Sequence, residues 1–165
     1  MSENHQKRMP IEDGELAKGL REWMVKSGLK IEQIEEREEG VVRWRFSAVD
    51  GMGVFLTLVE MESGDFTQVN FEVTMTFLEP RLQGPIMEWL FHYSYESFMP
   101  FKLCLDESNA LVMRFADLVE PHDPEYLIFL ARELINESNE LLRSLCVKFA
   151  LRPYLEILSS RKMAS

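Results

Sequence analysis

Strict alternation of apolar and polar side chains between residues 69 and 77 is the feature that most constrains the fold. The apolar members are Val69, Phe71, Val73, Met75 and Phe77, and the polar members between them are Asn70, Glu72, Thr74 and Thr76. Because successive side chains of a strand point to opposite sides, the pattern predicts a β-strand with one side against a core. A strand cannot pair its own backbone groups, so the chain must supply neighbouring strands.

Two strands are predicted before this one. Residues 42–46 alternate between apolar side chains and two arginines, and residues 54–61 are apolar on both sides, which is typical of a central strand. Asp50-Gly51 between them is a strong hairpin signal, and a second turn at residues 63–65 leads into the alternating strand. These short links predict three antiparallel neighbours.

Two further strands are predicted at residues 101–105 and 111–115, joined by turn residues at 106–109. How this hairpin joins the three-stranded unit is not predicted. The charged stretch 30–39 is compatible with either an irregular strand or a short helix, and the sequence leaves this choice open.

Three helices are predicted from apolar residues at helical spacing. The first covers residues 11–24, with Gly28 as its stop, and the second covers 85–99, opened by Pro85 and ended by Pro100. The last runs from about residue 124 to 149. Asp123 is its predicted N-cap, and its leucines recur every seven residues, at Leu127, Leu134 and Leu141.

The predicted fold class is therefore α+β: one antiparallel sheet of about five strands with helices packed on it, in the order α-β-β-β-α-β-β-α. Residues 11–158 are predicted to form a single domain, with flexible termini at 1–10 and 159–165. The chain length of 165 residues suits one domain.

The charge balance excludes several partners. Eighteen Lys and Arg residues against 28 Asp and Glu residues leave a net charge of −10, so binding to nucleic acid or to an anionic membrane is not expected. No apolar run near the amino terminus suggests a signal peptide, and we expect a cytoplasmic location. Cys104 and Cys146 lie in apolar surroundings and are interpreted as reduced, buried thiols.

No pattern of residues indicates catalysis, and the chain is not expected to be an enzyme. The three histidines, His5, His92 and His122, are isolated from cysteines and from each other, which argues against a metal site or a catalytic triad. The Gly-x-Gly at residues 51–53 lies between two strands and is interpreted as a turn, not as a phosphate cradle. We therefore predict no catalytic residue, no metal and no cofactor.

The second helix is unusual, because its apolar side chains cover an arc of roughly 240° where about 100° suffices for packing on a sheet. Four residues on one side form a candidate interface: Met87, Phe91, Tyr95 and Phe98. One interpretation is a symmetric homodimer that covers them. The other is that the third helix folds over them and the chain is monomeric.

The segment 99–115 carries a family resemblance. It comprises a short strand, an acidic turn and the sequence Leu111-Val-Met-Arg-Phe115, followed by the capped last helix. This segment resembles the YbjN-type family of proposed sensory-transduction regulators, and the element order resembles the type III secretion chaperone-like fold. The resemblance implies a small non-enzymatic protein, often dimeric, that binds other proteins, so an unidentified protein client is expected.

Two other functions stay open. One is a small-molecule-binding protein or enzyme with a pocket between sheet and helices, for which the candidate lining residues are Tyr93, Tyr95, His92 and Cys104. The other is a structural subunit of a larger assembly.

Overall fold

The computed structural model describes residues 11, 14–38, 40–48, 50–61, 64–96, 101–120 and 124–163, with the backbone alone for 32–38 and 93–96. The elements in chain order are α1 (Glu15–Lys26), β1 (Lys30–Glu38), β2 (Val41–Ser47), β3 (Gly53–Glu60), β4 (Thr67–Phe77), α2 (Pro80–Glu96), β5 (Lys102–Leu105), β6 (Ala110–Val119), α3 (Glu125–Phe149) and α4 (Tyr154–Met163). The fold is α+β, as predicted. The predicted arm 1–10 lies outside the described residues.

All six strands belong to one antiparallel sheet, in the order β1-β2-β3-β4-β6-β5. The first four strands follow one another as a meander, and the β5–β6 hairpin joins it by pairing β6 with β4. This pairing places β3 in the interior of the sheet, as the apolar composition of residues 54–61 predicts, and β4 lies in the interior beside it. Gly51 has a φ of 85° in the β2–β3 turn, a conformation that favours glycine.

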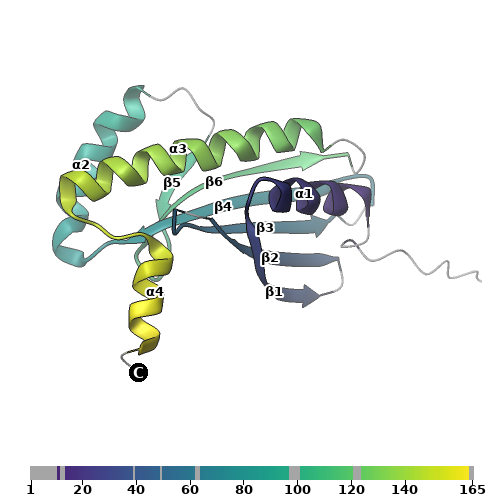
Figure 1. The fold of residues 1–165 in the computed structure, drawn as a ribbon. Helices are drawn as coiled ribbons and strands as arrows, with labels where there is room; N and C mark the ends of the chain where they lie inside the picture. The colour runs from purple at the N-terminus through teal and green to yellow at the C-terminus, as the bar shows by residue number, and fades with distance from the viewer. Residues whose placement is uncertain are drawn as a thin grey trace, which may run out of the picture.

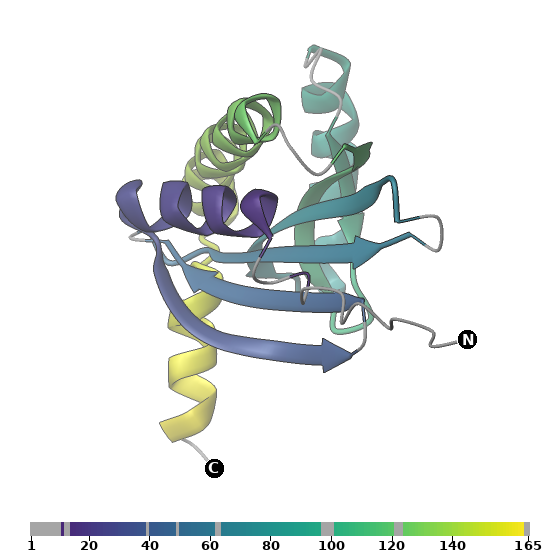
Figure 2. The same ribbon diagram turned by 90° about the vertical axis from the view of Figure 1, so that its right-hand side faces the viewer.

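The core lies between one side of the sheet and the helices α1 and α3, which Figures 1 and 2 show on the same face. In β4 the predicted apolar positions Val69, Phe71, Val73 and Met75 are buried. Thr74 and Thr76 are buried as well and Phe77 is only half-buried, at the place where the register of β4 shifts between Thr74 and Thr76. The seven-residue spacing of α3 brings Leu127, Leu134 and Leu141 into this core without exposed surface. The sequence pattern of α3 is thus confirmed, whereas the alternation of β4 is confirmed for residues 69–73 and wrong for Thr74, Thr76 and Phe77.

The open question at residues 30–39 resolves as a strand, β1, which makes six strands where about five were predicted. β1 pairs only with β2 and is therefore an edge strand. Its register shifts twice, between Ile31 and Gln33 and between Ile34 and Glu36. Such irregularities are common in edge strands, because they discourage pairing with another chain. They also break the clean alternation that would have identified the strand.

The predicted start of the second helix at Pro85 is wrong. The helix begins at Pro80, and Pro85 lies inside it. A proline at the first helical position costs no hydrogen bond, and both prolines could take that role. Strand β4 ends at Phe77, shortly before Pro80, and the helix starts at this first proline. Pro85 then lies inside the helix, where its missing N–H costs one backbone hydrogen bond to the Arg81 carbonyl. The predicted end at residues 99 and 100 lies outside the described residues.

The C-terminal helix α4 packs on the opposite side of the sheet from α1 and α3 (Figure 2). It contains no buried residue. The Leu155 N–H donates to the Gly51 carbonyl at 2.8 Å, and the Thr76 hydroxyl donates to the Arg152 carbonyl at 2.7 Å. The helix α4 continues to Met163, beyond the predicted domain end at residue 158. The assignment of a single domain stays a prediction. None of the described helices is long and apolar enough to cross a membrane.

Candidate functional site

The predicted interface residues lie on α2, and the structure places two of their side chains. Met87 is half-buried and contacts the core, whereas the Phe91 ring is 73% exposed. The side chain of Tyr95 and all of Phe98 lie outside the described residues. Phe91 is therefore the member of the set that a partner could reach in the described structure.

The other side of α2 is held by the chain itself. Ile86 and Leu90 are buried in the core. The Trp89 ring meets Phe149 of α3 edge-on, with 6.0 Å between ring centres, and the Lys148 ammonium lies 5.7 Å from the Trp89 ring centre. The third helix thus contacts Trp89, which is outside the predicted interface set, and it leaves Phe91 in water.

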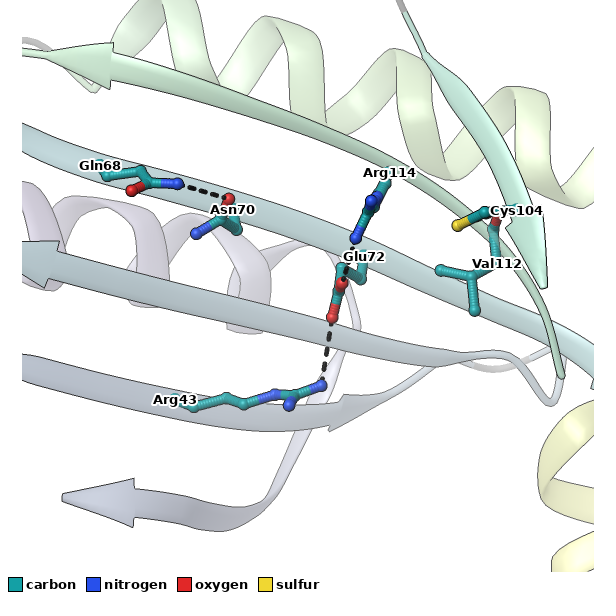
Figure 3. A network of polar contacts seen from close by, with 7 residues as sticks. All are labelled: Arg43, Gln68, Asn70, Glu72, Cys104, Val112 and Arg114. Atoms are coloured by element: carbon teal, nitrogen blue, oxygen red, sulfur yellow. Dashed lines mark hydrogen bonds and ion pairs between the residues drawn. The ribbon is translucent and has the colours of Figure 1, made fainter. Parts of the chain in front are cut away.

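A charged network crosses the opposite face of the sheet (Figure 3). Glu72 on β4 lies directly across from Arg114 on β6, at 3.7 Å, and accepts a hydrogen bond of 3.1 Å from Arg43 of β2. The Arg43 guanidinium reaches over β3, where it lies 4.7 Å from the centre of the Phe55 ring. The arginines 43 and 114 are therefore engaged within the chain, and each partly neutralises the single carboxylate between them.

Beside this network the sheet carries a hollow of about 570 Å³, bounded by the β5–β6 turn and by Tyr154 of α4. Cys104 lines it, and its sulfur lies 3.8 Å from the Val112 carbonyl (Figure 3). His92 is exposed on α2 and does not line the hollow. The predicted ligand-pocket set is therefore not brought together at Cys104, and the side chains of Tyr93 and Tyr95 lie outside the described residues.

Both cysteines are free thiols, and both are half-buried where full burial was expected. Burial raises the pKa of the Cys104 thiol, against the opposing effect of the Arg114 charge, and burial also raises the pKa of Cys146. A raised pKa leaves less thiolate at neutral pH, and the thiolate is the nucleophile. The environment therefore makes both cysteines poor nucleophiles.

In the part of the chain that the structure describes, no three His, Cys, Asp or Glu side chains come close enough to hold a metal ion. The acidic stretch at residues 32–38, whose side chains are not described, is outside that statement.

Comparison with known proteins gives similarity to solved structures only. No family model and no curated protein matches the chain. The crystal structure of YbjN from E. coli, a proposed transcription regulator, aligns with 82% of this chain and 93% of its own, at 11% identity and a TM-score of 0.47. An uncharacterized protein from Methanothermobacter thermautotrophicus aligns with 77% of this chain and 96% of its own, at 10% identity and a TM-score of 0.48. The family resemblance stated from the sequence is thus also found by structural comparison, and at this identity it concerns the fold alone.

Proposed function

We propose that this chain is a non-enzymatic protein-binding module, of chaperone-like or regulatory type, which holds its partner through the outer side of α2. The observation that carries the proposal is the Phe91 ring, 73% exposed on a helix whose side chains Ile86 and Leu90 are buried. Met87 and Trp89 of the same helix are half-buried. Exposed aromatic rings of this kind are enriched in the centres of protein interfaces.

The partner that we propose first is a second copy of the chain. A two-fold symmetric pairing brings the same helix of each copy together, so one apolar patch covers the other. Met87 adds a pliable side chain next to Phe91 on the same side of the helix, which suits a surface that must adapt to its own copy. An unidentified client could use the same surface when the copies separate.

The non-enzymatic part of the proposal is supported by the state of the thiols. Cys104 and Cys146 are the strongest nucleophiles in the described residues, and burial keeps both in the neutral form. The alternative of a small-molecule site has one supporting observation, the hollow of about 570 Å³ beside Arg43 and Glu72. Its polar groups bind each other, which favours a structural role for them.

Sedimentation equilibrium of three proteins tests the proposal: the wild type, Phe91→Asp and Phe129→Asp. Phe129 is a matched control, because it is also an exposed phenylalanine on a helix, at 53% exposure on α3. We expect the wild type and Phe129→Asp to sediment as dimers and Phe91→Asp as a monomer with unchanged helix content. A wild type of monomer mass at all concentrations would refute the homodimer, and equal effects of both substitutions would refute the role of α2.

A further inference from the structure

We propose that a pocket beside α4 binds a small organic acid, a monocarboxylate with an apolar body. This α4 pocket has a volume of about 500 Å³, within the range of small-molecule sites, and its lining includes Phe77, Leu78, Asn109, Leu151, Ile157 and Arg161. It lies at the end of the sheet where β4 leads into α2 and α3 leads into α4 (Figure 1).

The α4 pocket is separate from the proposed protein-binding surface. It touches α2 only at Pro80, the first residue of that helix, and Phe91 lies about three helical turns further along. Binding of a small acid therefore accompanies the protein-binding role proposed above and does not replace it.

The apolar floor of the pocket results from two local features of the chain. The register of β4 shifts between Thr74 and Thr76, and Thr76 is buried there in place of Phe77. The Phe77 ring therefore lies beside α4, with 5.1 Å between its centre and that of the Tyr154 ring. Ala150, with a φ of 55°, ends α3 and turns the chain toward α4. Both features bring apolar side chains to one hollow, where they can cover the body of a ligand.

Arg161 is the cation that selects an anionic ligand. It lines the pocket, and its guanidinium carbon lies 4.3 Å from the centre of the Phe77 ring. Stacking on an aromatic ring uses the face of the guanidinium and leaves the N–H groups at its edge, which can hold both oxygens of one carboxylate. Among the residues that the structure describes, no carboxylate lies within ion-pair distance of Arg161.

The other charged side chains that line the pocket are paired within the chain. Arg152 pairs with Glu156 at 3.7 Å, and Glu79 pairs with Arg81 at 2.7 Å. The residues at positions 164 and 165, which follow α4, carry no charged side chain. One positive charge, that of Arg161, is therefore left for a ligand and matches one carboxylate. A phosphate monoester carries about −1.5 to −2 charges and needs more cations.

The β5–β6 turn supplies the polar rim. The carboxylate of Asp106 accepts hydrogen bonds from the backbone N–H and the hydroxyl of Ser108, at 2.8 and 2.7 Å, and it lines the neighbouring hollow together with Glu107. Asn109 lines the α4 pocket, and its Oδ1 accepts a hydrogen bond of 3.0 Å from Gln83. The amide nitrogen of Asn109 carries two N–H donors, for which the described residues offer no acceptor, so it can bind the acid as well.

An NMR titration of the full chain with cinnamate tests the proposal, because cinnamate joins one carboxylate to a flat apolar body. We expect saturable shifts of the backbone amide signals of Ser108, Asn109 and Ser160, with a Kd of about 1 mM or tighter for a ligand of this size. Cinnamamide has a similar body without the charge and should bind about tenfold more weakly. Phenyl phosphate should bind no better than cinnamate.

Three variants locate the site. Arg161→Gln should weaken cinnamate binding by about tenfold or more, because it removes the charge and the paired donors. The matched control Arg143→Gln removes the same charge from an exposed position of α3 and should bind cinnamate as the wild type does. Ser160→Tyr keeps Arg161 but fills the pocket, so it should abolish binding, and it tests the site independently if Arg161→Gln loosens α4.

Any of four results would overturn the proposal: no saturable shift with cinnamate, tighter binding of phenyl phosphate, unchanged binding by Ser160→Tyr, or equal binding by the two arginine variants. Phe91→Asp should bind cinnamate normally, so failure of this proposal is distinguishable from failure of the α2 proposal.

Discussion

The helices α3 and α2 are both rich in apolar residues, but they use them differently. α3 lies along the sheet, and its regularly spaced leucines Leu127, Leu134 and Leu141 have no exposed surface (Figure 1). α2 stands at the end of the sheet, and only part of its apolar surface, including Ile86 and Leu90, is buried, while Phe91 is not. The comparison shows that placement on the sheet, and not apolar content, decides whether a side chain stabilises the fold or stays available to a partner.

Leu134→Ala should have the largest effect on stability. The side chain is fully buried in the middle of α3, and truncation removes apolar contacts and leaves a cavity. We expect the free energy of unfolding to fall by about 2–5 kcal/mol, measured by urea denaturation. A loss below that range would show that α3 is held less firmly than the comparison requires.

Trp89→Ala tests the contact between the two helices. Trp89 is half-buried, touches Phe149 edge-on and lies under the Lys148 ammonium. We expect a loss of about 1–3 kcal/mol by urea denaturation, less than for Leu134→Ala because the ring is already partly exposed. An effect as large as that of Leu134→Ala would mean that α2 belongs to the core as fully as α3 does.

Gly84→Ala should not stabilise the chain, although it replaces a glycine in a helix. Gly84 lies in α2, and apart from its chain neighbours a Cβ built there meets no atom within 4 Å. Alanine favours the helix over glycine by about 0.5–1 kcal/mol, but Gly84 precedes Pro85, whose ring disfavours helical dihedral angles for a residue that carries a Cβ. We therefore expect no rise in the free energy of unfolding by urea denaturation, and a gain of about 0.5–1 kcal/mol would contradict this. Gly53→Ala should destabilise more, because its Cβ would lie 2.9 Å from the Tyr154 ring.

Phe91→Ser should have the smallest effect on the stability of the isolated chain. The ring makes few contacts that the substitution could remove, so we expect a change within about 0.5 kcal/mol at a dilution where copies are separate. At high concentration the wild type should gain stability from association and the variant should not. A large loss at high dilution would identify Phe91 as part of the core.

The sequence predicts those parts of the fold that have a strong local period. The alternation at residues 69–73 and the leucine spacing of α3 both specify a buried side, because the apolar residues recur at a constant spacing. The alternation fails from Thr74 onward, because the register of β4 shifts there. The start of α2 is not predictable in the same way, because Pro80 and Pro85 both fit a first helical position. The strand at residues 30–38 escapes prediction since its register shifts interrupt the alternation.

The candidate sites are less predictable than the fold, because each depends on strand register or on packing between distant segments. The excess apolar surface of α2 is visible in the sequence, but which ring stays exposed depends on where α3 packs. The bridging of Arg43 and Arg114 by Glu72 requires the order of β2, β3, β4 and β6.

The central claim is that the Phe91 ring is exposed in one chain and covered by a second copy. Hydroxyl-radical footprinting read by mass spectrometry, over a series of protein concentrations, measures this exposure directly. We predict that oxidation at Phe91 falls as the concentration rises, while oxidation at Phe129 stays constant. Rapid oxidation of Phe91 at every concentration would contradict the claim, and so would protection that is already complete at the highest dilution.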